Sequence, residues 1–379
     1  MNIKILSMQR VVNYGSFMQA FALKQVLETF GHRVVFCDFK SGLPRHLGEK
    51  VKSERLSEKL MRLPKHIFNL RNFIEKRLFR RKLRKSYMDH AWEKLGINSE
   101  LNYNYACDVM VIGSDEVFNY TQNHGFGYVP ALFGHDIPAS SIISYAASAG
   151  YATAKDVESD NMVAELSAGL AKFDHLGVRD KNTYEMVASY AQKTPVYVID
   201  PTLLYDFDDV IPPAPIASGY VLIYAYDGRL DAPEDVEKIL AFANAKGLRT
   251  VSVGFYHEWC DENLVATPFE LLSIFRHAAY VVTDTFHGTI FSIKNRKPFV
   301  SLVRGENRWG SNSSKLGFLL HQLGLEHRIN RDLAQLESHL DTVIDYVQVY
   351  ELLERLKASS MQFLENALKD AEIKLRNKP

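Results

Sequence analysis

The sequence predicts an α/β protein with two Rossmann-type domains, a cleft between them and a helical segment at the C-terminus. Short β-branched, apolar runs alternate with longer stretches of helical periodicity, a pattern typical of parallel sheets connected by helices. The length of 379 residues exceeds the usual size of one domain. A Pro-rich, acidic stretch at residues 206–215 separates two such series and is interpreted as a linker.

The first series predicts a domain at residues 1–205. A helix over residues 16–30 connects its first two strands and ends at Gly31, with Ser16 as a suitable N-cap. The strands of this domain are expected at residues 3–8, 34–39, 109–114, 142–147 and 196–200.

The second series predicts a domain at residues 216–330, followed by amphipathic helices over 331–379. Two α/β domains with a helical tail form the GT-B-like arrangement, in which ligands bind between the domains at the carboxyl ends of the strands. The strands are expected at 220–226, 250–255, 280–283 and 299–303, with helices at 233–245 and 268–276.

A basic amphipathic insertion is predicted at residues 50–90 of the first domain. Between residues 50 and 85 fourteen Lys and Arg stand against three Glu, a net charge of +11, and apolar residues recur among them at helical spacing with a break near Pro64. One interpretation is an interfacial helix that binds the anionic surface of the inner membrane. The other is a solvated helical hairpin that packs on the first domain.

The overall composition argues against several classes of protein. Lys plus Arg and Asp plus Glu number 45 each, which does not predict nucleic-acid binding. No stretch approaches the roughly 20 apolar residues of a membrane helix, and the N-terminus leads directly into a strand pattern, so we expect a cytoplasmic protein. Three dispersed cysteines and thirteen histidines form no metal-binding motif, so we expect no metal.

Four candidate site segments follow predicted strands or, for Arg179, an apolar stretch. Asn13, Tyr14 and Ser16 precede the first helix, where free amides suit an anion or sugar hydroxyls, although a plain turn is the alternative. Asp115 and Glu116 end a strand, where they could bind hydroxyls, act as acid or base, or cap a helix.

The other two segments carry basic residues. Arg179, held by the neighbouring Asp180, offers a forked donor for carboxylate or phosphate, with a surface ion pair as the alternative. Residues 281–290 present His287 and Gly288 at the start of a helix, and the loop that follows the next strand adds three cations. These cations are Arg304, Arg308 and Lys315. The Asp-Pro-Thr sequence at residues 200–202 is interpreted only as a turn that leaves the domain.

Taken in order, these motifs resemble the polysaccharide pyruvyl transferase family. The resemblance covers the chain from Met1 to about Arg328. It rests on Asn-Tyr-Gly-Ser within residues 13–23, Thr-Asp-Thr-Phe-His-Gly at 283–288, and the segments 113–119, 144–148, 178–180, 200–202, 315–320 and 323–325. Where this chain has Glu116, the family more often has glutamine.

The resemblance implies a GT-B-like bacterial enzyme of capsule or exopolysaccharide synthesis that transfers pyruvate from phosphoenolpyruvate to a sugar of a lipid-linked glycan precursor. It implies Arg179, His287, Gly288 and a cation among Arg304, Arg308 and Lys315 as donor-binding residues. Ketal formation requires a general acid, a base for the hydroxyls and positive charge for the phosphate, and requires no metal or cofactor.

On this reading the catalytic residues are His287, Arg179 and Asp115, and Asp284 orients His287. The acceptor sugar is expected at Asn13, Tyr14, Ser16, Asp115 and Glu116. Two alternatives stay open: a nucleotide-sugar glycosyltransferase, in which Asp284 would bind the ribose, and a non-catalytic glycan-binding protein.

Overall fold

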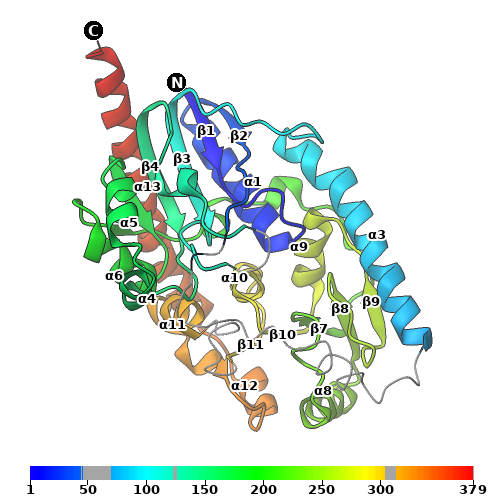
Figure 1. The fold of residues 1–379 in the computed structure, drawn as a ribbon. Coiled ribbons are helices and arrows are strands. Elements are labelled where there is room, and N and C mark those ends of the chain that lie inside the picture. The colour runs from blue at the N-terminus through cyan, green and yellow to red at the C-terminus, as the bar shows by residue number, and fades with distance from the viewer. Residues whose placement is uncertain (44, 46–69, 123–125, 304–312, 379) are drawn as a thin grey trace.

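Two six-stranded sheets, in which every paired strand is parallel, form the framework of the structure (Figure 1). The structure is a computed structural model and describes residues 1–43, 45, 70–122, 126–303 and 313–378. The strand orders are β2-β1-β3-β4-β5-β6 and β12-β11-β10-β7-β8-β9. The predicted GT-B-like fold class, with two parallel-sheet α/β halves, is confirmed.

The first sheet lies within residues 2–197. Its central strands are buried because helices cover both faces, which explains their continuous apolar runs. The strands are β1 (Asn2–Leu6), β2 (Arg33–Cys37), β3 (Cys107–Asp115), β4 (Ala139–Ala147), β5 (His175–Val178) and β6 (Val196–Tyr197). The helices are α1 (Tyr14–Thr29), α3 (Leu70–Leu95), α4 (Ala154–Ser159), α5 (Val163–Leu170), α6 (Lys181–Tyr190) and α7 (Pro201–Leu204).

Two predictions in this half are corrected. The last predicted strand stops at Tyr197, because Asp200 caps the short helix α7 and Pro201 occupies its first position. Helix α1 is capped by Asn13 rather than Ser16: Oδ1 of Asn13 accepts hydrogen bonds from the amides of Gly15 (2.8 Å) and Ser16 (3.2 Å).

The second sheet lies within residues 220–330. Strand β10 and helix α8 have the predicted bounds, whereas the short edge strands β9 and β12 were not predicted. The strands are β7 (Tyr220–Tyr224), β8 (Arg249–Val253), β9 (Glu262–Leu264), β10 (Tyr280–Thr283), β11 (Phe299–Leu302) and β12 (Ile329–Asn330). The helices are α8 (Pro233–Ala245), α9 (Pro268–His277), α10 (Phe286–Lys294) and α11 (Ser313–Gln322).

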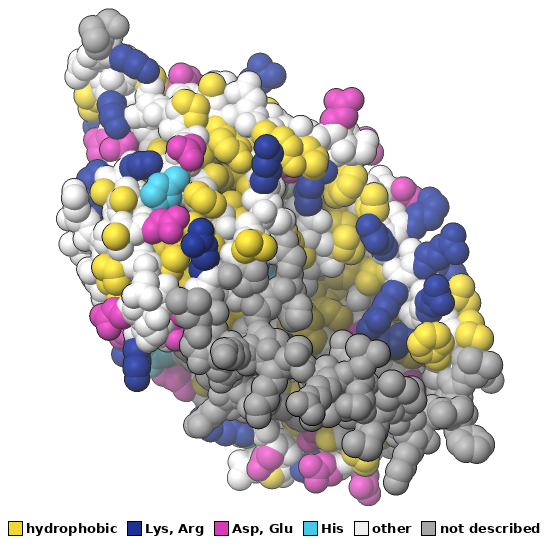
Figure 2. All heavy atoms as spheres, in the orientation of Figure 1, with side chains coloured by type: hydrophobic (Ala, Val, Ile, Leu, Met, Phe, Trp, Pro, Cys, Tyr) yellow, Lys and Arg dark blue, Asp and Glu magenta, His cyan; other side chains and the backbone are white. Residues whose placement is uncertain are grey.

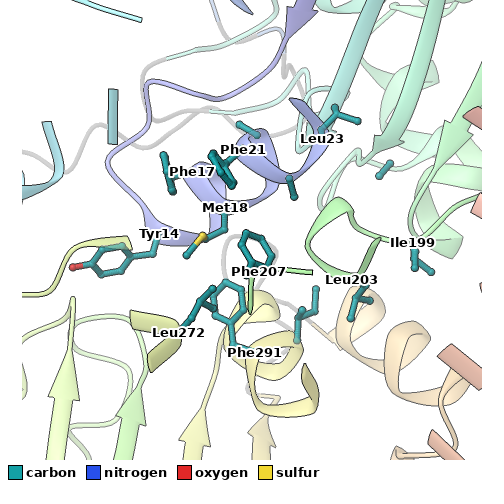
Figure 3. Packing of buried hydrophobic residues seen from close by; sticks show 14 of the residues in the cluster. Tyr14, Phe17, Met18, Phe21, Leu23, Ile199, Leu203, Phe207, Leu272 and Phe291 are labelled. Atoms are coloured by element: carbon teal, nitrogen blue, oxygen red, sulfur yellow. The ribbon is translucent and has the colours of Figure 1, made fainter. Parts of the chain in front are cut away.

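Helix α1 lies between the two halves and joins their cores. The ring of Phe269 on α9 packs edge-on against Phe17 and Phe21 of α1, at centroid distances of 5.7 and 5.1 Å. Figure 3 shows these α1 side chains facing Phe207, Leu272 and Phe291. One hydrophobic cluster therefore runs continuously from the first sheet to the second.

The C-terminal segment consists of α12 (Leu336–Asp341) and the long helix α13 (Tyr346–Arg376), as the amphipathic pattern predicted. Helix α13 returns to the first sheet (Figure 1). The ring of Phe363 packs on Tyr145 at 6.3 Å, and Oγ of Ser360 accepts a hydrogen bond of 3.0 Å from the amide of Ile199. By its packing, α13 completes the N-terminal half, whereas α12 packs on the second half.

Helix α3, the described part of the basic insertion, contacts both halves. The Tyr87 hydroxyl donates to the carbonyl of Val11 (3.0 Å), and Nε of Arg80 donates to Oδ2 of Asp227 (3.1 Å). The rest of the insertion, including the break predicted near Pro64, lies outside the described residues. Across the described ranges, each helix is too short or too polar to cross a bilayer.

Replacement of Phe363 tests the packing of α13. We expect Phe363→Ala to lower the free energy of unfolding by about 3–5 kcal/mol, because it removes a buried aromatic ring between α13 and β4. Val347→Ala is the matched control, since Val347 lies on the same helix with 73% of its surface exposed. Denaturant unfolding of both variants checks the prediction, and similar losses would contradict it.

Candidate active site

A buried carboxylate, Asp200, brings together the two basic residues that the sequence analysis placed in the site. Nη1 of Arg179, which directly follows β5, donates to Oδ2 of Asp200 at 2.8 Å. Nε2 of His287, in the first turn of α10, lies 3.5 Å from the same oxygen atom. Because Arg179 and Asp200 belong to the first half and His287 to the second, this cluster spans the two halves.

Asp200 is the residue that sequence reasoning missed, because it was interpreted only as part of a turn. Its Oδ1 caps α7 by accepting from the amide (3.0 Å) and hydroxyl (2.7 Å) of Thr202, which fixes the carboxylate. Burial raises its pKa, but His287 and Arg179 outweigh that effect and hold the pKa well below its usual range. The Asp-Pro-Thr sequence predicts a helix cap at Asp200. It does not reveal the contacts with Arg179 and His287, because both residues are distant in sequence.

Arg179 is enclosed by charged and aromatic groups. Its Nη2 donates to Oδ1 of Asp115 at 3.3 Å, and its guanidinium lies 4.9 Å from the centre of the Phe286 ring. Burial lowers its pKa, and the attraction of Asp200 and Asp115 more than compensates, so the net direction is upward. Asp180, the partner predicted from the sequence, instead caps α6 through the Thr183 amide (2.9 Å).

Two buried nitrogen atoms in this cluster have no hydrogen-bond partner among the described residues. They are Nε of Arg179 and Nε2 of His287, the latter at ion-pair distance from Asp200 but outside hydrogen-bond geometry. Unsatisfied buried polar atoms are costly and uncommon in folded proteins. Nε2 of His287 already faces the carboxylate of Asp200, so Nε of Arg179 is the donor of this cluster that could serve a further anionic group.

The imidazole of His287 packs directly against helix α1. A Cβ atom at Gly15 would lie 2.1 Å from Nδ1 of His287, so only a glycine leaves room for the ring. Gly288 has a similar role, since a Cβ there would lie 2.2 Å from Oγ1 of Thr283, and its amide donates to Oγ1 of Thr285 (2.9 Å). The close approach at Gly15 holds the imidazole against α1, and the contacts of Gly288 hold the first turn of α10 against the end of β10.

Asp115 lies at the carboxyl end of β3, beside Arg179. Its Oδ2 accepts a hydrogen bond of 2.7 Å from the Ser16 hydroxyl, and its φ of +77° places it in the left-handed region that non-glycine residues rarely adopt. Ser16 therefore positions Asp115. A backbone outlier that orients a carboxylate toward a polar cluster is typical of functional sites.

Glu116 forms an ion pair between the halves. Its Oε1 pairs with Nζ of Lys315 on α11, and its Oε2 accepts from Nδ2 of Asn119 at 2.9 Å. Burial raises the pKa of Glu116, but Lys315 outweighs it and lowers the pKa to about 2. Of the three cations predicted for this loop, Lys315 lies beside the cluster, while Arg304 and Arg308 lie outside the described residues.

Tyr14 and Asp284 lie near the cluster but have other contacts. The Tyr14 hydroxyl donates to the carbonyl of Ala266, and its ring is buried between the halves. Asp284 accepts from the Tyr226 amide (3.0 Å) and lies 3.4 Å from Nη1 of Arg229, and burial raises its pKa. The carboxylate found beside His287 is Asp200, and the orienting role of Asp284 stays a prediction.

The cluster as a whole combines three basic and three acidic side chains, and all of them except Lys315 lie at the carboxyl ends of strands. This is where open parallel sheets bind ligands. Within the described ranges, no three His, Cys, Asp or Glu side chains are grouped so that they could hold a metal ion.

Comparison with solved structures gives distant similarities. The chain is similar to an O-GlcNAc transferase mutant of Thermobaculum terrenum (14% identity, TM-score 0.43, 98% of this chain and 67% of that one). It is also similar to Arabidopsis thaliana UGT89C1 with quercetin (12% identity, TM-score 0.47, 98% of this chain and 99% of that one). A third similar structure is S. aureus MnaA with UDP (10% identity, TM-score 0.44, 95% of this chain and 91% of that one). These values assign no function.

Comparison with protein families identifies a family for this chain. No curated protein matches the chain. The family model described as "Polysaccharide pyruvyl transferase" matches residues 13–306, which include Asn13, Asp115, Arg179, Asp200 and His287. The chain therefore belongs to the polysaccharide pyruvyl transferase family.

Proposed function

We propose that this enzyme transfers the pyruvyl unit of phosphoenolpyruvate to two hydroxyls of a sugar in a surface glycan precursor, forms a cyclic ketal and releases phosphate. The observation that carries the proposal is the meeting of Arg179 and His287 at Asp200, with Nε of Arg179 buried and without a hydrogen-bond partner among the described residues. Phosphoenolpyruvate carries two anionic groups on a three-carbon skeleton, which match a compact basic cluster.

The reaction requires protons to move in a defined order. A proton is added to C3 of the donor, and C2 gains oxocarbenium character. The oxygen of one sugar hydroxyl then bonds to C2 and loses its proton. Cleavage of the C2–O bond releases phosphate, and the second hydroxyl closes the ring as it loses its own proton. The site must therefore supply an acid, a base and fixed positive charge.

We assign the donor to Arg179, His287 and Lys315. All three are held by carboxylates in the structure, so the donor's anionic groups would compete with Asp115 for Arg179 and with Glu116 for Lys315. Asp200 is fully buried and would stay in place as the common anchor. On this assignment the positive charge that receives the leaving phosphate is already oriented before the reaction.

We assign the acceptor hydroxyls to Asp115. Its carboxylate lies at the strand end between Ser16 and Arg179, so a hydroxyl bound there would be next to a donor bound to Arg179. The low pKa of Glu116 makes that neighbouring carboxylate a weak proton acceptor near neutral pH. Asp115 is therefore our candidate base.

An assay of phosphate release tests the proposed function. With phosphoenolpyruvate and a suitable sugar acceptor, we expect inorganic phosphate to appear together with an acceptor that has gained a pyruvyl group in mass. Transfer that requires a nucleotide sugar would instead indicate a glycosyltransferase, and binding of glycan without turnover would indicate a non-catalytic protein.

Arg179→Lys is the matched site variant in this assay. It keeps the charge beside Asp200, whereas Arg179→Ala would leave a buried carboxylate unpaired and cost about 3–5 kcal/mol of stability. Loss of one charge-assisted hydrogen bond, about 1.5–3 kcal/mol, should lower kcat/KM for phosphoenolpyruvate about 10- to 150-fold. Arg376→Lys, on an exposed surface, should have no effect; an equally active Arg179→Lys enzyme would exclude Arg179 from donor binding.

Asp115→Asn separates the two substrates. Because it removes a negative charge beside Arg179, calorimetric titration should show unchanged or tighter phosphoenolpyruvate binding. Turnover should fall about 100-fold or more, as for loss of a catalytic base. Asp136→Asn is the matched control, since Asp136 is exposed and also has a positive φ of 56°. Weaker donor binding with normal acceptor saturation would reverse the assignment.

Gly15→Ala tests the place of His287 without changing a charged group. The added methyl would clash with the imidazole, so the ring must move and turnover should fall at least tenfold. Gly317→Ala is the control, because a Cβ there has open space and lies within helix α11. Full activity of Gly15→Ala with a normal thermal midpoint would show that the position of His287 is not required.

A further inference from the structure

The outward face of helix α3 exposes large apolar side chains within two helical turns. Phe73, Ile74 and Leu78 are 65%, 47% and 51% exposed. Exposure of single apolar residues is common, but three neighbouring large ones on one helix mark an interaction surface. Figure 2 shows hydrophobic side chains at the N-terminal end of α3, beside a row of Lys and Arg along the helix.

The same stretch carries cations without compensating acid. Between residues 73 and 85 the only carboxylate is Glu75, which accepts a hydrogen bond of 3.1 Å from the Tyr256 hydroxyl. Within the described part of the chain, four exposed cations of this stretch take part in no ion pair. These four are Arg77, Arg81, Lys82 and Arg84.

Other side chains of α3 attach the helix to the protein. Phe79, Tyr87, Ala91 and Leu95 are buried, and the ring of Phe79 packs on Tyr256 at 5.7 Å. Lys76 (3.6 Å) and Arg80 of α3 both pair with Asp227, which belongs to the second half of the protein. The helix is therefore held along its length, and the exposed residues form a fixed surface.

This surface lies on the same side of the molecule as the candidate active site. The partners of α3 are Val11, which follows β1, Asp227, which follows β7, and Tyr256, which follows β8. All three belong to loops at the carboxyl ends of strands, where Asp115 and His287 also lie. A partner bound to the outside of α3 would thus lie on the side of the molecule where the strands end at the site.

We propose that the outward face of α3, formed by Phe73, Ile74, Leu78 and the four unpaired cations, docks the enzyme onto an anionic lipid surface. Cations attract anionic headgroups, while exposed apolar side chains enter the region between headgroups and acyl chains. A nucleic acid would bind the cations and leave the apolar residues in water, so the combination favours lipid. The proposal does not depend on the donor or on the chemistry of the site.

Co-sedimentation of the full chain with vesicles tests the proposal. We expect binding to vesicles of phosphatidylcholine with phosphatidylglycerol at low salt, weaker binding at high salt, and recovery in the supernatant with phosphatidylcholine alone. Recovery in the supernatant with both lipids at low salt would overturn the proposal. Equal binding to both lipids would overturn the role of charge.

Two pairs of matched variants locate the surface. The combined change Arg77→Gln, Arg81→Gln, Lys82→Gln and Arg84→Gln should weaken binding at least tenfold, and Ile74→Ser with Leu78→Ser should also weaken it. Removal of four exposed cations from α13 and the residues directly after it, or of the exposed apolar pair Val343 and Val347, should leave binding unchanged. The α13 control is Arg355→Gln, Lys369→Gln, Arg376→Gln and Lys378→Gln.

Thermal unfolding and phosphate release without vesicles accompany each variant. We expect both to match the wild type, because none of the changed side chains belongs to the site. Equal loss of vesicle binding in the α3 and α13 variants would show that binding depends only on the net charge of the protein. That result would overturn the assignment of the surface to α3. Binding to a soluble acidic polymer but not to vesicles would assign a different partner and would also overturn the proposal.

Discussion

The buried ion pair between Arg179 and Asp200 is the interaction on which the site depends. Both side chains are almost completely removed from water, so each charge requires the other. Asp200 also begins α7 and lies beside His287 of the second half. One carboxylate thus fixes the end of the first sheet, a basic residue next to it and the first turn of α10. The remaining polar residues of the site are arranged around this pair.

Further contacts position the residues around this ion pair. Ser16 orients Asp115, Gly15 leaves space for His287, and Asn13 caps the helix that carries them. The residues Asn13 to Ser16 therefore act largely by positioning neighbouring residues and by capping α1. Substrate contact by Asn13 and Tyr14 stays a prediction, because both side chains already have partners in the protein.

Much of the fold could be predicted because buried parallel strands and capped helices leave strong local patterns. Strand β10 and helix α8 are examples. The roles of Asp180 and Asp200 could not be predicted, because adjacency in sequence favoured Asp180 as the partner of Arg179 while the chain brings in Asp200 from 21 residues away. Likewise α13 is amphipathic by pattern, but its pattern does not reveal that it packs on the first sheet.

The position of α1 restricts how the two halves can move. Its aromatic residues contact the second half as closely as they contact their own, so a movement that separated the halves would expose Phe17, Phe21 and Phe269 to water. Hydration of that much aromatic surface is unfavourable. Relative motion should therefore take the form of a rotation about the axis of α1, with this helix serving as a pivot that stays buried throughout. Such a motion would leave the aromatic contacts of α1 in place, so polar contacts between the halves, such as the pair Glu116–Lys315, would have to change instead.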